Sequence, residues 1–266
     1  MKKVMFIVVL VLLLAAFGVS AVMVGNYLVD SKEQANRNEE LVQMVESAKA
    51  TDAGEAVPGE TGAEAQTIPS IVGADGILTE YAGLYELNSD MVGWLEIPNT
   101  KLKYPVMQTP EEPNYYLYRD FDKEDSAWGA VYAWESADIN KPSDNITLFG
   151  HNMKDGSMFA ALNDYENEYF WENNKLILFN TMQEYHTYKI FAVFKTEATV
   201  GKGFSYHKFV DAADAAAFND FVATCKSLSL YDTGITPVYG DKLICLSTCA
   251  YHTENGRLVV AAVRIT

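Results

Sequence analysis

The chain opens with an unbroken apolar run from Val4 to Val24 that contains no charged side chain. A helix of about 20 apolar residues is long enough to span the roughly 30 Å hydrocarbon core of a bilayer. Residues 1–3 (Met-Lys-Lys) precede the run and a polar, acidic segment follows it, which favours a short cytoplasmic tail and an exported remainder. The pattern predicts a single-pass membrane anchor. The alternative is a cleaved signal peptide, because Val19-Ser20-Ala21 resembles a small-residue cleavage site.

Residues 25–80 are predicted to form an acidic, partly helical spacer. The segment carries 11 acidic and 3 basic residues. Residues 30–50 predict a polar helix whose apolar side chains lie on one side, at Leu41, Met44 and Val45. Residues 51–70 are rich in Ala, Gly, Glu and Thr and lack aromatic side chains, so they cannot bury enough apolar surface to offset the entropy of ordering the chain. We expect this segment to hold a folded domain away from the membrane.

From residue 81 onward the pattern changes to short β-branched and aromatic runs bounded by Pro, Gly, Asn or Asp. The runs predict eight strands: 92–97, 101–108, 129–133, 145–149, 175–179, 187–195, 242–248 and 257–265. Two segments have helical periodicity instead, Ser157–Asn173 and Asp211–Leu228. Residues 81–266 therefore predict one mainly β domain, a barrel or a sandwich, with a few added helices.

Composition and charge narrow the class of protein. The formal net charge of -16 excludes a general binder of nucleic-acid phosphates, which needs a basic surface. A hydrophobic content of 49% excludes a mainly disordered chain. No group of His, Cys and carboxylate residues has the sequence spacing of a metal site, so we expect no metal and no other cofactor.

The three cysteines differ in their sequence context. Their odd number leaves at least one free thiol if the protein is exported. Cys225 lies on the apolar face of a predicted helix and Cys245 within a predicted strand, as is typical of small buried residues, and whether these two pair is left open. Cys249 ends a strand beside the polar turn 250–256, where a thiol reaches solvent and substrate. Cys249 is therefore the candidate nucleophile, provided that a nearby cation favours its thiolate.

Two residues are candidate partners for Cys249. His151 follows the predicted strand 145–149 after a single Gly, so it also lies at a strand end beside a loop. Arg257 opens the strand that follows the short connection from Cys249, and a forked cation there would hold a peptide carbonyl or an oxyanion. The other histidines have less favourable positions: we expect His186 at the surface, His207 in a non-catalytic Gly-rich stretch, and His252 in a turn that does not aim its ring at the sulfur.

Several blocks of sequence together resemble one enzyme family. They are Leu-Ser-Thr-Cys at 246–249 with Arg-Leu-Val-Val at 257–260, LFGHNMKDGSMF at 148–159, and NSDMVGWLEIPNT at 88–100 with YPVMQ at 104–108. These blocks resemble sortases, the membrane-anchored cysteine transpeptidases of Gram-positive cell surfaces. The last block and the helix before the cysteine strand resemble class B rather than class A enzymes. The resemblance covers residues 81–266.

The resemblance implies an eight-stranded sortase-type β-barrel with an N-terminal helical extension and an inserted helix before the cysteine strand. It assigns Cys249 as the nucleophile, His151 as the general acid/base and Arg257 as the ligand of the oxyanion or substrate carbonyl. The implied substrates are surface proteins with a Thr-containing sorting signal near the carboxyl end. The implied acceptor is an amine of a peptidoglycan precursor or of a pilin subunit.

Four further residues are expected near the substrate: Ser247 and Thr248, which flank the nucleophile, Asn114 in a polar-aromatic element, and Tyr206 in a predicted groove wall. The alternative for Ser247 and Thr248 is that they only finish the strand. No Asn or Asp in the sequence is nominated to orient His151, so we expect slow turnover and a bell-shaped dependence of rate on pH. A cysteine peptidase that only hydrolyses and a non-catalytic, membrane-tethered β-domain are the alternative functions.

Overall fold

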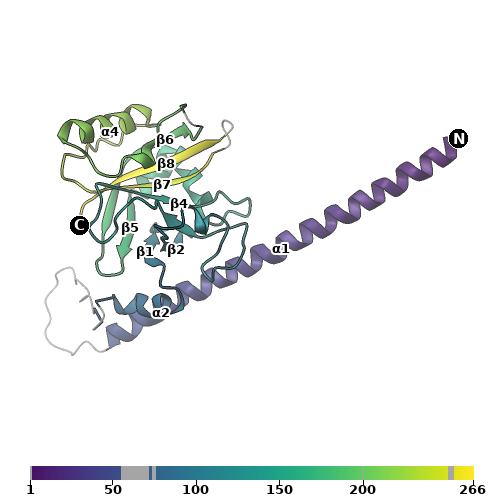
Figure 1. Cartoon of the computed structure of the whole chain (residues 1–266), viewed down its shortest axis with the longest axis horizontal. Coiled ribbons are helices and arrows are strands. Elements are labelled where there is room, and N and C mark those ends of the chain that lie inside the picture. Colours follow the sequence, from purple (N-terminus) through teal and green to yellow (C-terminus); the bar gives the residue numbers. More distant parts are fainter. Residues whose placement is uncertain (1, 55–71, 74–75, 200, 251–254) are drawn as a thin grey trace. The chain divides into compact units, whose positions relative to one another are not determined.

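The computed structural model describes residues 2–54, 72–73, 76–199, 201–250 and 255–266 (Figure 1). The chain forms two compact units, Met1–Glu40 and Leu41–Thr266. Part of the predicted spacer and the turn that contains His252 lie outside the described residues.

The first unit consists of the amino-terminal part of helix α1 (Lys2–Gly54). Large apolar side chains along it are exposed, for example Leu12 at 64% and Phe17 at 72%. Such a surface is stable against lipid rather than water. By length and composition the helix is able to cross a membrane, a test that an N-terminal signal sequence also meets.

The end of α1 belongs to the second unit, which begins earlier than the sequence pattern places the start of the domain. Leu41 and Val45 are 2% and 0% exposed, and they join a hydrophobic cluster that includes Tyr81 and Leu84 of helix α2 (Thr79–Leu87). Residues four positions apart lie on one face of a helix, so this pair forms a short apolar stripe. The stripe draws this part of the predicted spacer into the core of the domain.

The second unit contains a closed barrel, which confirms the predicted mainly β fold. In the part of the chain that the structure describes, eight strands form it: β1 (Met91–Glu96), β2 (Lys103–Met107), β3 (Val131–Ala133), β4 (Asn145–Phe149), β5 (Leu176–Thr181), β6 (Thr187–Glu197), β7 (Leu243–Cys249) and β8 (Gly256–Arg264). Their order around the barrel is β1-β2-β3-β4-β7-β8-β6-β5. The pairs β2/β3 and β4/β7 are parallel and the other pairs are antiparallel.

Side chains cap the starts of two helices of the second unit. Helix α4 (Ala215–Leu228) starts after Asp214, whose carboxylate accepts a hydrogen bond from the Ala217 amide at 2.9 Å. It is shorter than predicted because Asp211 is engaged elsewhere, accepting from the Asp144 amide at 3.0 Å. The other predicted helix, 157–173, is divided into η2 (Phe159–Glu166) and α3 (Glu168–Asn173) at a capping residue, Asn167. Two further short turns are η1 (Tyr115–Leu117) and η3 (Tyr206–Lys208).

Helix α4 covers one face of the barrel beside β6 (Figure 1). Its buried side chains are those that the sequence pattern placed on its apolar face: Phe218, Phe221, Val222 and Cys225. They pack in one cluster with Cys245 of β7 and Val259 of β8. The helix therefore holds the middle of the two strands whose ends form the candidate site.

Candidate active site

Cys249 and Arg257 lie directly opposite each other at the end of the antiparallel pair β7/β8. Opposite residues in such a pair point to the same side of the sheet, with Cβ atoms about 4.5–5.5 Å apart. Both side chains are partly exposed. The Arg257 guanidinium donates to the backbone carbonyls of Gly256 at 3.0 Å and Asn255 at 3.4 Å. The pairing makes these two residues near neighbours.

His151 is held beside the same strand end by the residues on either side of it. Three hydrogen bonds connect them to β7: Gly150 N to Ser247 O at 3.2 Å, Thr248 Oγ1 to Gly150 O at 2.9 Å, and Asn152 Nδ2 to Cys249 O at 2.7 Å. The parallel pairing of β4 with β7 sets up these contacts, because it places Phe149 beside Ser247. His151, two residues beyond β4, and Cys249, the last residue of β7, thus lie at the same end of two neighbouring strands.

The glycine before His151 is required by packing. A Cβ atom at Gly150 would lie 2.6 Å from the ring of Phe159, far closer than two carbon atoms approach without a shift. The Phe159 amide in turn donates to the His151 carbonyl at 2.9 Å. The chain therefore passes directly against the Phe159 ring at Gly150, and His151 is bonded to the Phe159 backbone.

A backbone carbonyl orients the imidazole of His151. Nε2 of the ring lies 2.7 Å from the carbonyl oxygen of Leu117. A carbonyl only accepts hydrogen bonds, so Nε2 carries a proton and Nδ1 is the basic nitrogen of the neutral ring. Tyr118 contacts the ring from outside, with centroids 5.7 Å apart, and is itself 62% exposed. The sequence nominated no side chain for this orienting role, and the structure places a main-chain oxygen there.

Two tyrosine hydroxyls lie in the electrostatic field of the same site. Burial and the charge of Glu135 raise the pKa of Tyr132, while the Arg257 guanidinium opposes that rise. Burial likewise raises the pKa of Tyr206 to about 12 against the opposing effects of its bond to Ser247 and the charge of Arg257. Both phenols are therefore neutral near pH 7, and the Tyr132 hydroxyl donates to Asn114 Oδ1.

The four residues expected near the substrate occupy different environments. Asn114 is exposed, and its Oδ1 accepts from the Tyr132 hydroxyl at 3.2 Å. Ser247, Thr248 and Tyr206 are only 1%, 2% and 3% exposed. The Ser247 hydroxyl is 2.5 Å from that of Tyr206, and the Thr248 hydroxyl bonds to the loop before His151. In this conformation these three side chains build the site and offer almost no surface to a peptide.

An aromatic group beside the site was not identified from sequence. The rings of Trp134 and Phe149 meet that of His207 edge-on, at centroid distances of 4.9 and 6.2 Å. Burial, followed by the charges of Lys208 and Arg257, lowers the pKa of His207. Trp134 follows β3, Phe149 ends β4 and His207 lies in η3, so these rings come together only in the folded barrel. His186 corrects another expectation, because it is buried at 7% exposure rather than lying at the surface.

The three cysteines differ in burial, as their sequence context predicted. All three are free. Cys225 and Cys245 are buried at 0% exposure, and burial raises the pKa of both thiols. A buried thiol in apolar surroundings is chemically inert. Cys249, partly exposed beside Arg257, is the cysteine with the access that a nucleophile needs.

Comparisons with known proteins agree with this geometry. A family model described as the sortase domain matches residues 95–265. The chain is 31% identical to sortase B of Listeria monocytogenes over 190 residues, which are 70% of this chain and 74% of that protein. It is 29% identical to sortase B of Staphylococcus aureus over 185 residues, 69% of this chain and 73% of that protein.

Solved structures have the same fold. A Staphylococcus aureus sortase B–substrate complex superposes with a TM-score of 0.74 at 24% identity, covering 90% of this chain and 99% of that one. A sortase B complexed with triglycine has a TM-score of 0.73 at 25% identity, covering 89% of this chain and 99% of that one. The relatives thus share the barrel fold.

Proposed function

The chain belongs to the sortase family as a class B member, a cysteine transpeptidase that anchors surface proteins, and from this premise we propose the roles of its site residues. Cys249 is the nucleophile, His151 is the general acid/base, and Arg257 stabilises the oxyanion. The observation that supports the proposal is the pairing of Cys249 with Arg257 in β7/β8, together with the hydrogen bonds that join the residues on either side of His151 to the same end of β7. No other cysteine of the chain is both free and accessible.

The first half-reaction forms a thioester. The Cys249 thiolate adds to the carbonyl carbon of a Thr in a sorting signal near the carboxyl end of a surface protein. The oxyanion that develops is stabilised by the Arg257 guanidinium, a permanently charged donor in the same strand register. The tetrahedral intermediate then expels the amine of the following residue, and the His151 imidazolium gives that amine its proton through Nδ1. The acyl group remains on sulfur as a thioester.

The second half-reaction transfers the acyl group to an acceptor amine. Neutral His151 takes a proton from the amine as it attacks the thioester, and the Cys249 thiolate leaves. The acceptor we propose is an amine of a peptidoglycan precursor or of a pilin subunit. A relative was solved in complex with triglycine, a peptide that carries an amine at one end. Helix α1 would hold the enzyme at the outer face of the membrane, with its catalytic domain exported.

The experiment that tests these roles measures the mass of the adduct on Cys249. The protein without its apolar segment is incubated with a library of Thr-containing sorting peptides, alone and with a glycine peptide as acceptor. We expect an acyl adduct on the wild type, a ligated product when the amine is present, and neither with Cys249→Ala. Cleaved acid without ligation would identify a peptidase instead. Retention of full function by Cys249→Ala would identify a non-catalytic binding domain.

A further inference from the structure

The Leu117 carbonyl accepts from Nε2 of His151 and leaves Nδ1 to exchange protons. The contacts that hold this carbonyl in place therefore bear on the function of the imidazole. Leu117 ends the short turn η1, in the connection between β2 and β3. Its amide donates to the Asn114 carbonyl at 3.0 Å, within the turn itself. A three-residue turn has little stability of its own. The turn must therefore be fixed by contacts with the rest of the domain.

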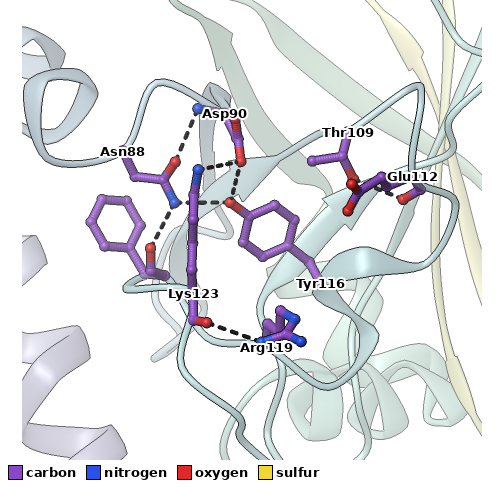
Figure 2. Close-up of polar contacts among 8 residues, drawn as sticks. Asn88, Asp90, Thr109, Glu112, Tyr116, Arg119 and Lys123 are labelled. Carbon is purple, nitrogen blue, oxygen red and sulfur yellow. Dashed lines mark hydrogen bonds and ion pairs between the residues drawn. The ribbon is translucent and has the colours of Figure 1, made fainter.

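Tyr116, next to Leu117, supplies such a contact. Its side chain is 0% exposed and lies in the hydrophobic cluster with Tyr81 and Trp94. Its hydroxyl donates to Asp90 Oδ2 at 2.7 Å and accepts from Asn88 Nδ2 at 2.9 Å. Figure 2 shows these groups converging on one point. The hydroxyl thus fixes η1 to the segment that links α2 to β1.

The chain that follows η1 returns to the same point. Asn88 Nδ2 also donates to the Phe121 carbonyl at 2.7 Å, and the Lys123 ammonium lies 2.8 Å from Asp90 Oδ2 (Figure 2). Burial alone would raise the pKa of Asp90, but the bonds from Lys123 and Tyr116 outweigh it and lower that pKa. The carboxylate is therefore ionised at neutral pH. The bonds made by Asn88 and Asp90 thus hold the backbone both before and after Leu117.

Gly129 shows that the Leu117 carbonyl itself is closely packed. A Cβ atom at Gly129 would lie 2.6 Å from Leu117 O and 2.7 Å from Tyr116 O. The φ angle of +59° at this position also favours glycine. The Ala130 amide donates to Tyr116 O at 3.0 Å, on the same side. The carbonyl oxygen is therefore confined between this backbone and the imidazole of His151.

We propose that Tyr116, held by Asn88 and Asp90, is a positioning residue for His151. It fixes the Leu117 carbonyl, the carbonyl fixes the proton on Nε2, and Nδ1 is left to exchange protons with the thiol and the amines. The proposal rests on the proposed function, because it assigns to His151 the role of general acid/base. Tyr116 touches no reacting atom, so its effect appears in the orientation of the imidazole and in kcat rather than in substrate affinity.

The test compares Tyr116→Phe with Tyr81→Phe. Tyr81 is a matched control because it is also 0% exposed, lies in the same cluster, and loses one side-chain hydrogen bond, to Asn180 at 2.8 Å. For Tyr116→Phe we expect kcat to fall by about ten- to a hundredfold, with KM within about twofold of wild type, as for a misplaced catalytic group. We expect Tyr81→Phe to retain kcat within about twofold, because its hydroxyl does not reach η1. Asp90→Asn, which keeps an acceptor oxygen, should give an intermediate kcat.

A second measurement reports directly on the imidazole of His151. The ¹⁵N shifts of the His151 imidazole distinguish its neutral tautomers, and we expect the Nε2–H form in wild type and in Tyr81→Phe. In Tyr116→Phe we expect a mixture of tautomers and a shifted pH of maximum rate. The same tautomer and the same kcat in both variants would refute the positioning role. If the wild type forms no adduct on Cys249, the catalytic assignment fails, whereas the tautomer comparison still decides whether Tyr116 holds the ring.

Discussion

Replacement of Thr248 by valine tests how strand β7 holds the catalytic loop. The Thr248 hydroxyl is buried and donates to the Gly150 carbonyl at 2.9 Å, one residue before His151. Valine has nearly the same shape, so the substitution removes a hydrogen bond without opening a cavity. The carbonyl loses its side-chain donor in a region that water reaches poorly. The loss of such a partner costs about 1–3 kcal/mol of unfolding free energy.

The measurement is urea unfolding of Thr248→Val beside Thr147→Val. Thr147 is a buried threonine of the neighbouring strand, and its hydroxyl accepts only a long 3.4 Å contact from Asn145 among the bonds described. With a urea dependence of about 2 kcal/mol per M, the expected loss lowers the midpoint by roughly 0.5–1.5 M for Thr248→Val. We expect a smaller shift for Thr147→Val, because its hydrogen bond is weaker.

The same substitutions are also expected to differ in activity. Thr248→Val should also lower kcat by about tenfold, because a loop that is free to move holds its imidazole less accurately. Thr147→Val should leave kcat unchanged. Equal midpoints for the two variants would refute the argument that the bond stabilises the loop. A destabilised Thr248→Val with wild-type kcat would show that the loop keeps its geometry without the bond.

Three further outcomes are expected. Arg257→Ala should fold normally and lower kcat/KM by about a hundredfold or more, as for loss of an oxyanion donor, and near-normal turnover would overturn its role. Val45→Ala, at a fully buried position of α1, should lower the unfolding free energy of the catalytic domain by about 1–3 kcal/mol in a thermal or urea melt, and an unchanged melt would contradict the packing of this part of α1 in the domain core. Although burial raises the pKa of Asp144, bonds from Lys242 and the Ala212 amide lower it overall. Its stabilisation is therefore present above the ordinary value of 3.8 and is lost as pH falls through the folded value, and Asp144→Asn should weaken the dependence of stability on pH below about 4.

The strands were predictable because each has its own local signal. The predicted strand 145–149 coincides with β4, and the other strand boundaries shift by a few residues at most. Such runs of β-branched and aromatic residues bounded by turn residues do not depend on their neighbours in space. Helix α2 lies in a segment whose pattern of hydrophobic and polar positions is weak. Its burial against the end of α1 depends on tertiary packing. A local pattern gives no sign of such a contact.

The residues of the candidate site have a sequence signal, whereas the groups that support them do not. Cys249, His151 and Arg257 stand out because each lies within two residues of the end of a strand. The Leu117 carbonyl that orients the imidazole has no sequence signal, since every residue carries a carbonyl. Similarly, the burial of Ser247 and Thr248 depends on segments far away in the sequence, since Ser247 is bonded to Tyr206 of η3 and Thr248 to Gly150.

The parallel pairing of β4 with β7 has a consequence for when the enzyme gains activity. The bonds that join the histidine loop to the cysteine strand connect residues 97 and 98 positions apart in the chain. Contacts of such long range form late in folding, after the loops between them have been closed. The cysteine strand also follows the histidine loop along the chain, so it is synthesised after that loop. In a chain whose barrel has not closed, Cys249 and His151 are therefore not held together, so an incompletely folded enzyme lacks its proposed catalytic pair.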